Sequence, residues 1–165
     1  MLGKEVKVRV EEKLRAKGYE LWPMGKPLAK YSWFRQSGRY LYLAGHGPFV
    51  GKDNVQKYKG KIGREYTVEQ GKEIGLTAVL SCLSSIKEAV GDLDRVKGIL
   101  QLMAYVNCAG EVEGYFHVAD GACDLLFELF GDYPARLAIG VSQTPLDVPI
   151  CMTMVVEVDE KAVAG

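Results

Sequence analysis

The sequence has little histidine and no clustered cysteine. It holds two histidines and four cysteines among 165 residues, and no two cysteines have the C-x-x-C spacing typical of a zinc site. The cysteines are too scattered to suggest the disulfide framework of a small secreted domain. These residues are Cys82, Cys108, Cys123, Cys151, His46 and His117. The sequence therefore predicts no metal site, and we expect no cofactor.

An excess of charge of either sign is also lacking. The 21 lysines and arginines balance 21 aspartates and glutamates, so no overall field attracts nucleic acid or an anionic membrane surface. The most basic window, residues 51–65, is rich in Gly and Lys, and we interpret it as a solvated loop. Neither nucleic acid nor a membrane is therefore expected as a partner.

Long apolar runs are missing as well. No run reaches the length of a membrane-spanning helix, and the charged N-terminal stretch lacks the apolar core of a signal peptide. We therefore expect a cytoplasmic protein. With 48% hydrophobic and 25% charged residues, the chain fits a single domain over residues 1–165 with a real core. Residues 1–28 form an N-terminal helical extension in this interpretation.

The first half of the chain predicts a helix, a hairpin and a longer helix. Residues 6–17 carry apolar side chains at helical intervals and end before Gly18. Residues 31–45 are rich in strand-forming aromatics, split by a Ser-Gly turn. The next helix opens at Thr67, because Thr67 and Gln70 have the spacing of a capping box, and it ends before Gly91.

The second half predicts three strands and one helix. Residues 99–107 are typical of a strand, residues 116–131 of an amphipathic helix, and residues 136–142 and 149–158 of two closing strands separated by Pro145 and Pro149. The whole order is helix, strand, strand, helix, strand, helix, strand, strand. This order indicates an α+β fold with helices on one face of a mixed sheet.

Two stretches add a more specific pattern. "PARLAIGVSQTPLDVPI", residues 134–150, opens a strand with Pro-Ala-Arg and continues through a small apolar run and a proline turn into a closing strand. "KYSWFRQSGRYLYLAGHGP", residues 30–48, places a tyrosine before the pair Ala44-Gly45. With the element order, these stretches resemble the Rid/YjgF family, also described as endoribonuclease L-PSP-like or translation-inhibitor-like, over about residues 30–158. The resemblance implies a mixed six-stranded-type sheet with two helices on one face (YjgF-like, chorismate-mutase-like) behind the N-terminal helix.

The same resemblance implies a homotrimer with three clefts between subunits. Arg136 falls on the family's arginine and would bind a small carboxylate of the 2-imino or 2-keto acid type, and Tyr31 falls on the family's tyrosine. A planar guanidinium offers a bidentate fork that orients a carboxylate as well as binding it. The alternative is that Arg136 points into water or pairs with an acid of its own chain, such as Asp132.

The family's best-known activity is the hydrolysis of reactive enamines and imines to 2-keto acids and ammonia. Active members hold the attacking water with a glutamate on the last strand, and the matching position here is Cys151, with Thr153 at the neighbouring acidic position. A neutral thiol or hydroxyl does not reproduce the charge and paired acceptors of a carboxylate. This departure weakens the prediction of imine hydrolysis.

Further candidates surround this position. Cys151 could be a nucleophile if a nearby cation lowered its pKa, although a buried structural cysteine is the commoner case. His46, at a strand end, could donate to a ligand or shuttle a proton, or serve only in packing. The Gly45 backbone could meet the ligand closely, and Asn107 at the end of its strand could face the cleft.

Three functions therefore remain open at this point. The first is a Rid-type enamine or imine deaminase, a hydrolase that needs Arg136 and a group that activates water. The second is a regulatory or ligand-binding trimer that keeps the arginine but has lost the chemistry, as Cys151 and Thr153 favour. The third is a ribonuclease or translation inhibitor, against which the zero net charge argues.

Overall fold

A computed structural model describes residues 9–160 of the chain. Its helices and strands follow the order α1 (Val10–Ala16), β1 (Phe34–Ser37), β2 (Tyr40–Leu43), β3 (Phe49–Val50), β4 (Val55–Gln56), α2 (Val68–Val90), β5 (Val96–Asn107), α3 (Asp120–Phe130), β6 (Ala135–Val141) and β7 (Ile150–Val158). The 3-10 turns η1 (Leu93–Arg95), η2 (Tyr115–Ala119) and η3 (Pro145–Asp147) precede β5, α3 and β7. The predicted order of elements is confirmed, except that the short strands β3 and β4 between β2 and α2 were not predicted.

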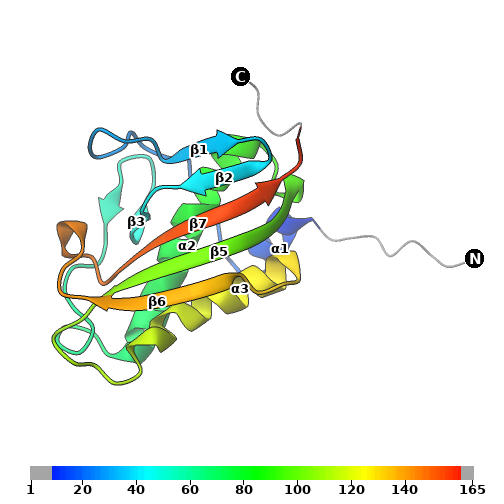
Figure 1. Ribbon diagram of the computed structural model, residues 1–165. Helices are drawn as coiled ribbons and strands as arrows, with labels where there is room; N and C mark the ends of the chain where they lie inside the picture. Colours follow the sequence, from blue (N-terminus) through cyan, green and yellow to red (C-terminus); the bar gives the residue numbers. More distant parts are fainter. Residues whose placement is uncertain (1–8, 161–165) are drawn as a thin grey trace, which may run out of the picture.

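The main sheet has five strands in the order β1-β2-β7-β5-β6 (Figure 1). Strands β5 and β6 are parallel, and the other neighbouring pairs are antiparallel. The α+β class with a mixed sheet is confirmed, but five strands replace the six-stranded type that we expected. Strands β3 and β4 are two residues long and pair only with each other, so they form a separate small hairpin beside the main sheet.

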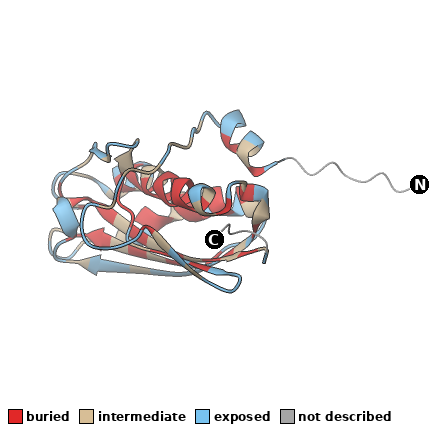
Figure 2. Cartoon of the chain, turned by 90° about the horizontal axis from the view of Figure 1, so that it is seen from above, coloured by how far each residue is buried: buried red, intermediate tan, exposed pale blue. Residues whose placement is uncertain are grey.

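Helices α2 and α3 cover one face of the sheet and bury the core beneath them (Figure 2). Along α2, Ile74, Val79 and Ile86 are buried. Helix α2 also lies very close to η2, because a Cβ on Gly75 would stand 2.9 Å from the Val118 carbonyl oxygen. Glycine inside a helix costs about 1 kcal/mol relative to alanine. At position 75 the glycine permits this close contact between α2 and η2.

The ends of α2 are those that the sequence predicts. The Thr67 hydroxyl accepts a hydrogen bond from the Gln70 backbone N–H at 3.2 Å, and the Gln70 side chain accepts one from the Thr67 N–H at 2.9 Å. This capping box satisfies two N–H groups that the first helical turn leaves without partners. Gly91 ends the helix with φ 77°. Within residues 9–160, no helix is both long and apolar enough to cross a membrane.

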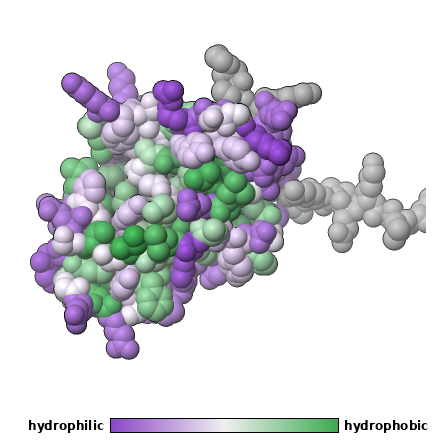
Figure 3. Space-filling model, viewed as in Figure 1, coloured by the Kyte–Doolittle hydropathy of each residue, from purple (hydrophilic) through white to green (hydrophobic). Residues whose placement is uncertain are grey.

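Within residues 9–160, no helix covers the opposite face of the sheet, which is partly apolar (Figure 3). Tyr42, Leu137 and Ile139 expose 48%, 46% and 37% of their surface there, and the neighbours of Tyr42 in β2 point into the core. Cys151 and Thr153 of β7 lie on the same face, between buried residues that point to the helices. The described part of the single chain, residues 9–160, therefore leaves one face of the sheet uncovered.

The N-terminal helix α1 is docked on the helix layer. Its Val10 and Leu14 are buried, and Lys13 Nζ donates at 3.1 Å to the carbonyls of Glu128 and Leu129 at the end of α3. A cation at a helix C-terminus satisfies free carbonyls and complements the helix dipole. The first residues of the helix predicted at 6–17 lie outside the described part of the chain.

Candidate functional site

Three hollows in the surface are lined by candidate residues or by their neighbours in the sequence. The first, which we call the apolar pocket, has a volume of about 420 Å³ and lies between β2, β7 and the η3 turn. The second, the charged hollow, has about 350 Å³ between α3 and the start of β6. The third, the mixed-charge groove, has about 1040 Å³ where the loops after β4 and β5 meet the end of β6.

The apolar pocket brings together three residues singled out from the sequence, namely Tyr31, Gly45 and Cys151. Their closeness depends on the glycine, because a Cβ on Gly45 would stand 2.9 Å from Cys151 Sγ. The Tyr31 ring packs edge-on against Trp33 with 5.3 Å between the ring centres. Its hydroxyl accepts a long hydrogen bond of 3.4 Å from the Leu28 N–H. The rest of the lining is apolar or backbone.

Cys151 is a protonated thiol at neutral pH. Burial raises its pKa to about 11 from an ordinary value near 9, because a thiolate loses hydration in this surrounding. The charge of Arg136 does not counter this effect, since the two side chains project from opposite faces of the sheet. A thiol in this state is neither an activated nucleophile nor a water-holding base.

His46 is buried and bonded within its own chain, which favours the packing role over that of a ligand donor or proton shuttle. The ring is fully buried. Its Nδ1–H donates to the Ala44 carbonyl at 2.8 Å, and Nε2 accepts from the Ser85 hydroxyl at 2.7 Å. Burial lowers its pKa to about 4, so the imidazole is neutral. Both nitrogens are thus used to join β2 to helix α2.

Arg136 lies in the charged hollow and pairs with an acid of its own chain. Its Nη1 donates to Asp120 Oδ1 at 2.5 Å, and the Arg136 side chain keeps 29% of its surface exposed. Asp120 is the first residue of α3 and also accepts from His117 Nδ1 at 2.7 Å. Burial alone would raise the pKa of Asp120, but the hydrogen bonds from Arg136 and His117 lower it overall. Arg136 therefore pairs with an acid of its own chain, as the alternative interpretation expects, but this acid is Asp120 and not Asp132.

The strand register explains why Arg136 and Cys151 are separate within one chain. Arg136 stands beside Leu102 of β5, whose side chain is buried under the helices. Cys151 stands beside Tyr105, on the uncovered face. Strands β6 and β7 lie on either side of β5 (Figure 1). By their register with β5, the two residues occupy opposite faces of the sheet.

Asn107 is likewise bonded within its own chain, which favours a structural role over a place in a ligand cleft. It is fully buried, and its Oδ1 accepts from Lys61 Nζ at 2.6 Å. Its amide nitrogen donates to Asp147 Oδ1 at 2.9 Å and to the Gly60 carbonyl at 3.2 Å. We call Asn107, Lys61 and Asp147 the amide network. It joins the end of β5 to the loop before α2 and to the turn before β7.

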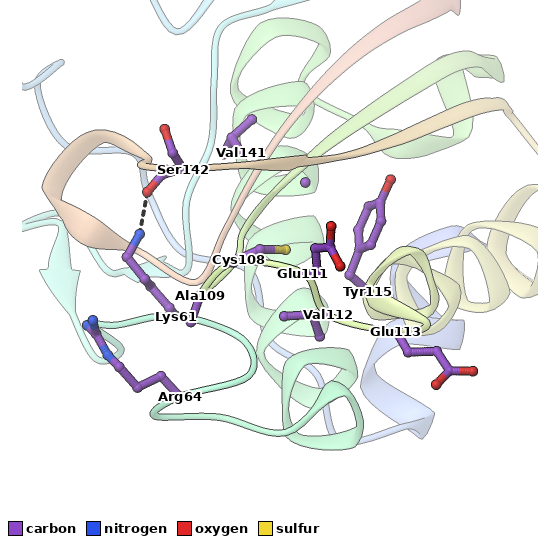
Figure 4. A pocket seen from close by; sticks show the side chains of 12 residues that line it. Lys61, Arg64, Cys108, Ala109, Glu111, Val112, Glu113, Tyr115, Val141 and Ser142 are labelled. Atoms are coloured by element: carbon purple, nitrogen blue, oxygen red, sulfur yellow. Dashed lines mark hydrogen bonds between the residues drawn. The ribbon is translucent and has the colours of Figure 1, made fainter.

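The mixed-charge groove is lined by basic side chains on one side and by acidic and aromatic side chains on the other (Figure 4). Lys61 and Arg64 lie on one side, and Glu111 and Tyr115 on the other. Lys61 Nζ also donates to the Ser142 carbonyl, which leaves its ammonium engaged with the protein. The window that we interpreted as a solvated loop therefore supplies one residue, Lys61, that helps to hold the fold together.

Four residues of these sites were not anticipated. Asp120 could have been suspected from an acid at the start of a predicted helix, where the helix dipole favours negative charge. Lys61 and Asp147 carry no such local signal, because their partner Asn107 is 46 and 40 residues away. Leu146 adopts φ 57°, a left-handed conformation that sequence patterns assign to Gly or Asn rather than Leu.

Comparison with known proteins identifies the relatives of this chain. The family described as "YjgF/chorismate mutase-like, putative endoribonuclease" matches residues 11–157. The family match therefore also covers residues 11–29, which lie before the motifs on which the resemblance in the sequence rests. Protein TCP17 of Trypanosoma cruzi is 32% identical over 155 residues, which cover 92% of this chain and 95% of that protein.

Solved structures agree with this match. A crystal structure described as a putative endoribonuclease from Shewanella oneidensis has a TM-score of 0.85 and 28% identity, covering 92% of this chain and all of that one. A protein of unknown function from Agrobacterium tumefaciens has a TM-score of 0.82 and 26% identity, covering 91% of this chain and 92% of that one. Both similarities extend over nearly the whole fold.

Proposed function

The chain belongs to the YjgF/chorismate mutase-like family, and on that premise we propose that it is a homotrimer that binds small carboxylates in clefts between subunits. We further propose that it binds these acids without efficiently hydrolysing imines. The observation that carries the proposal is the division of the candidate residues. Arg136 lies on the edge strand β6, and Tyr31, Gly45 and Cys151 gather at the apolar pocket beside β2 and β7.

A cleft between two subunits accounts for this division. The charged hollow has an arginine among its lining residues, whereas the apolar pocket has no charged side chain among its own. Placing the hollow of one subunit against the pocket of the next would give a ligand both a cation and an enclosed surface. Partial enclosure strengthens an arginine–carboxylate pair because less water screens it.

The uncovered sheet face supports self-association. Tyr42, Leu137 and Ile139 are exposed on it, and homomeric interfaces are more apolar than ordinary protein surface. Light scattering at micromolar concentration should give the mass of three chains. A monomer or dimer mass would contradict the trimer, and with it the shared cleft.

The test of the binding site is Arg136→Ala. We expect calorimetry with pyruvate to show binding by the wild type and a loss of about 2–5 kcal/mol of binding free energy in the variant, because the ligand loses its charge partner. Arg64→Ala is the matched control, since Arg64 is also an arginine paired with an acid but lies at the mixed-charge groove. Equal affinities of wild type and Arg136→Ala would exclude Arg136 as the ligand's anchor.

The absence of efficient hydrolysis follows from Cys151. A neutral thiol with a pKa of about 11 cannot hold and polarise a water as a carboxylate does. We expect wild type to release keto acid from 2-aminoacrylate near the spontaneous rate, and Cys151→Glu to exceed it, with the uncharged Cys151→Gln as control. Fast wild-type hydrolysis that Cys151→Glu slows would mean that another group performs the chemistry.

A further inference from the structure

The apolar pocket is built to exclude charge and to accept a hydrophobic group. Leu28, Phe49 and Val148 line it together with Tyr31, Gly45 and Cys151, so its polar groups are one phenol, one thiol and backbone. A carboxylate placed here would lose hydration without gaining a cation. The volume of about 420 Å³ lies within the range of about 300–1,000 Å³ that small-molecule sites occupy, and it exceeds what a methyl group fills.

Two glycines make room for this pocket. A Cβ on Gly47 would stand 2.7 Å from the Phe49 ring, as a Cβ on Gly45 would stand 2.9 Å from Cys151 Sγ. The backbone itself therefore forms part of the wall, and the Phe49 ring lies directly against it. A larger residue at either glycine would displace the side chains that shape the cavity.

Leu146 closes one side of the pocket from a turn with an unfavourable backbone. Leu146 and Asp147 both have φ 57°, which L-residues other than Asn and Asp adopt rarely. The turn is nevertheless well restrained. Gln56 Nε2 donates to the Leu146 carbonyl at 2.9 Å, the Gly60 N–H donates to the Asp147 carbonyl at 2.7 Å, and Asn107 holds the Asp147 carboxylate at 2.9 Å.

This restraint keeps an exposed leucine in place. The Leu146 side chain leaves 55% of its surface exposed although it lines the pocket, so it contributes little to the core. A strained conformation that persists under such restraint points to function more than to stability. The backbone around Leu146 is fixed from three directions while its side chain faces the cavity.

We propose that the apolar pocket receives the branched aliphatic side chain of the bound carboxylic acid, and that Leu146 determines how large a side chain is accepted. This inference rests on the proposed function, since Arg136 of a neighbouring subunit would hold the carboxylate. The preferred ligands are then 2-keto or 2-imino acids with hydrophobic side chains, rather than pyruvate or dicarboxylic acids.

The experiment compares three acids by calorimetry: pyruvate, 4-methyl-2-oxopentanoate and 2-oxoglutarate. We expect 4-methyl-2-oxopentanoate to bind at least about tenfold more tightly than pyruvate, because each buried methylene contributes about fourfold, and 2-oxoglutarate to bind no more tightly than pyruvate. Leu146→Ala should reduce the preference for the branched acid several-fold. Val55→Ala is the matched control, since Val55 is 54% exposed outside the pocket lining, and it should leave the preference unchanged.

The outcomes separate this inference from the proposed function. Binding of all three acids with similar affinity, abolished by Arg136→Ala, would overturn the side-chain specificity and leave the carboxylate site intact. If no acid binds, the uncharged 4-methyl-2-pentanone serves as probe with methyl-labelled leucines. Shifts of the Leu28 and Leu146 methyl NMR signals would show that the apolar pocket binds a branched aliphatic group without a carboxylate. Unchanged signals would show that the pocket is not a binding site for such a group.

Discussion

The apolar pocket is lined by uncharged groups, and the polar residues behind it are buried and hydrogen-bonded within the chain. The charged hollow instead contains an ion pair that is partly exposed to solvent. Behind the pocket, His46 and Asn107 are fully buried with their polar atoms bonded to the protein. In the hollow, Arg136 and Asp120 leave 29% and 34% of their side chains exposed. Substitutions behind the pocket should therefore change stability, and substitutions in the hollow should mainly change binding.

The largest effect is expected from breaking the amide network behind the pocket. Asn107→Leu keeps a similar volume but removes one hydrogen bond of the Lys61 ammonium, which keeps its bond to the Ser142 carbonyl, and one of the Asp147 carboxylate. Removing these bonds from part-buried charged groups should cost about 3 kcal/mol of the free energy of unfolding. Urea unfolding measures this cost, with Gln101→Leu, at an exposed position of the same strand, as control. A cost no larger than that of the control would show that the network is dispensable.

This network also marks how far the sequence could predict the site. The helix and strand order followed from local periodicity, and the capping box at Thr67 and Gln70 was confirmed in its hydrogen bonds. The grouping of Tyr31, Gly45 and Cys151 came from a family pattern. Contacts between distant segments, such as Asn107 with Lys61, could not be read from either, because a buried amide looks the same in a sequence whether its partner is a protein group or a ligand.

The second largest effect is expected from His46, whose burial should lower the free energy of unfolding at acidic pH. Its pKa is near 6.5 when unfolded and about 4 when folded, so between these values the unfolded chain binds more protons. Its contribution to stability is therefore complete above pH 6.5 and declines as the pH falls toward 4, by about 2–3 kcal/mol.

Urea unfolding at pH 7 and pH 4.5 tests this dependence. His46→Gln should lose less stability between the two pH values than wild type does. Gln101→Leu, at an exposed position of β5, should keep the wild-type slope, because it removes no titratable group. An unchanged slope in His46→Gln would assign the acid sensitivity to carboxylates instead.

A smaller effect is expected in the charged hollow, on binding rather than stability. Asp120 occupies the guanidinium that a ligand carboxylate would need. Asp120→Asn should therefore raise the affinity for a small carboxylate about tenfold, which corresponds to about 1.4 kcal/mol, and this gain should shrink at high salt. Calorimetry measures it, with Asp124→Asn as control, because Asp124 lines the same hollow while Asp120 holds the arginine. Equal gains in both variants would reflect only the removal of negative charge.

The smallest effect concerns the wall of the apolar pocket. Gly45→Ala should destabilise the protein by about 1 kcal/mol, because the new Cβ would stand 2.9 Å from Cys151 Sγ and overpacking forces a shift. Gly98→Ala is the control, since a Cβ there meets no atom within 4 Å. Because the clash involves one sulfur atom, Gly45→Ala should cost almost nothing in a Cys151→Ala background, and a double-mutant cycle isolates that coupling. If the cost is the same in both backgrounds, the close contact of Gly45 with Cys151 does not shape the pocket, and the backbone at Gly45 is constrained by other neighbours.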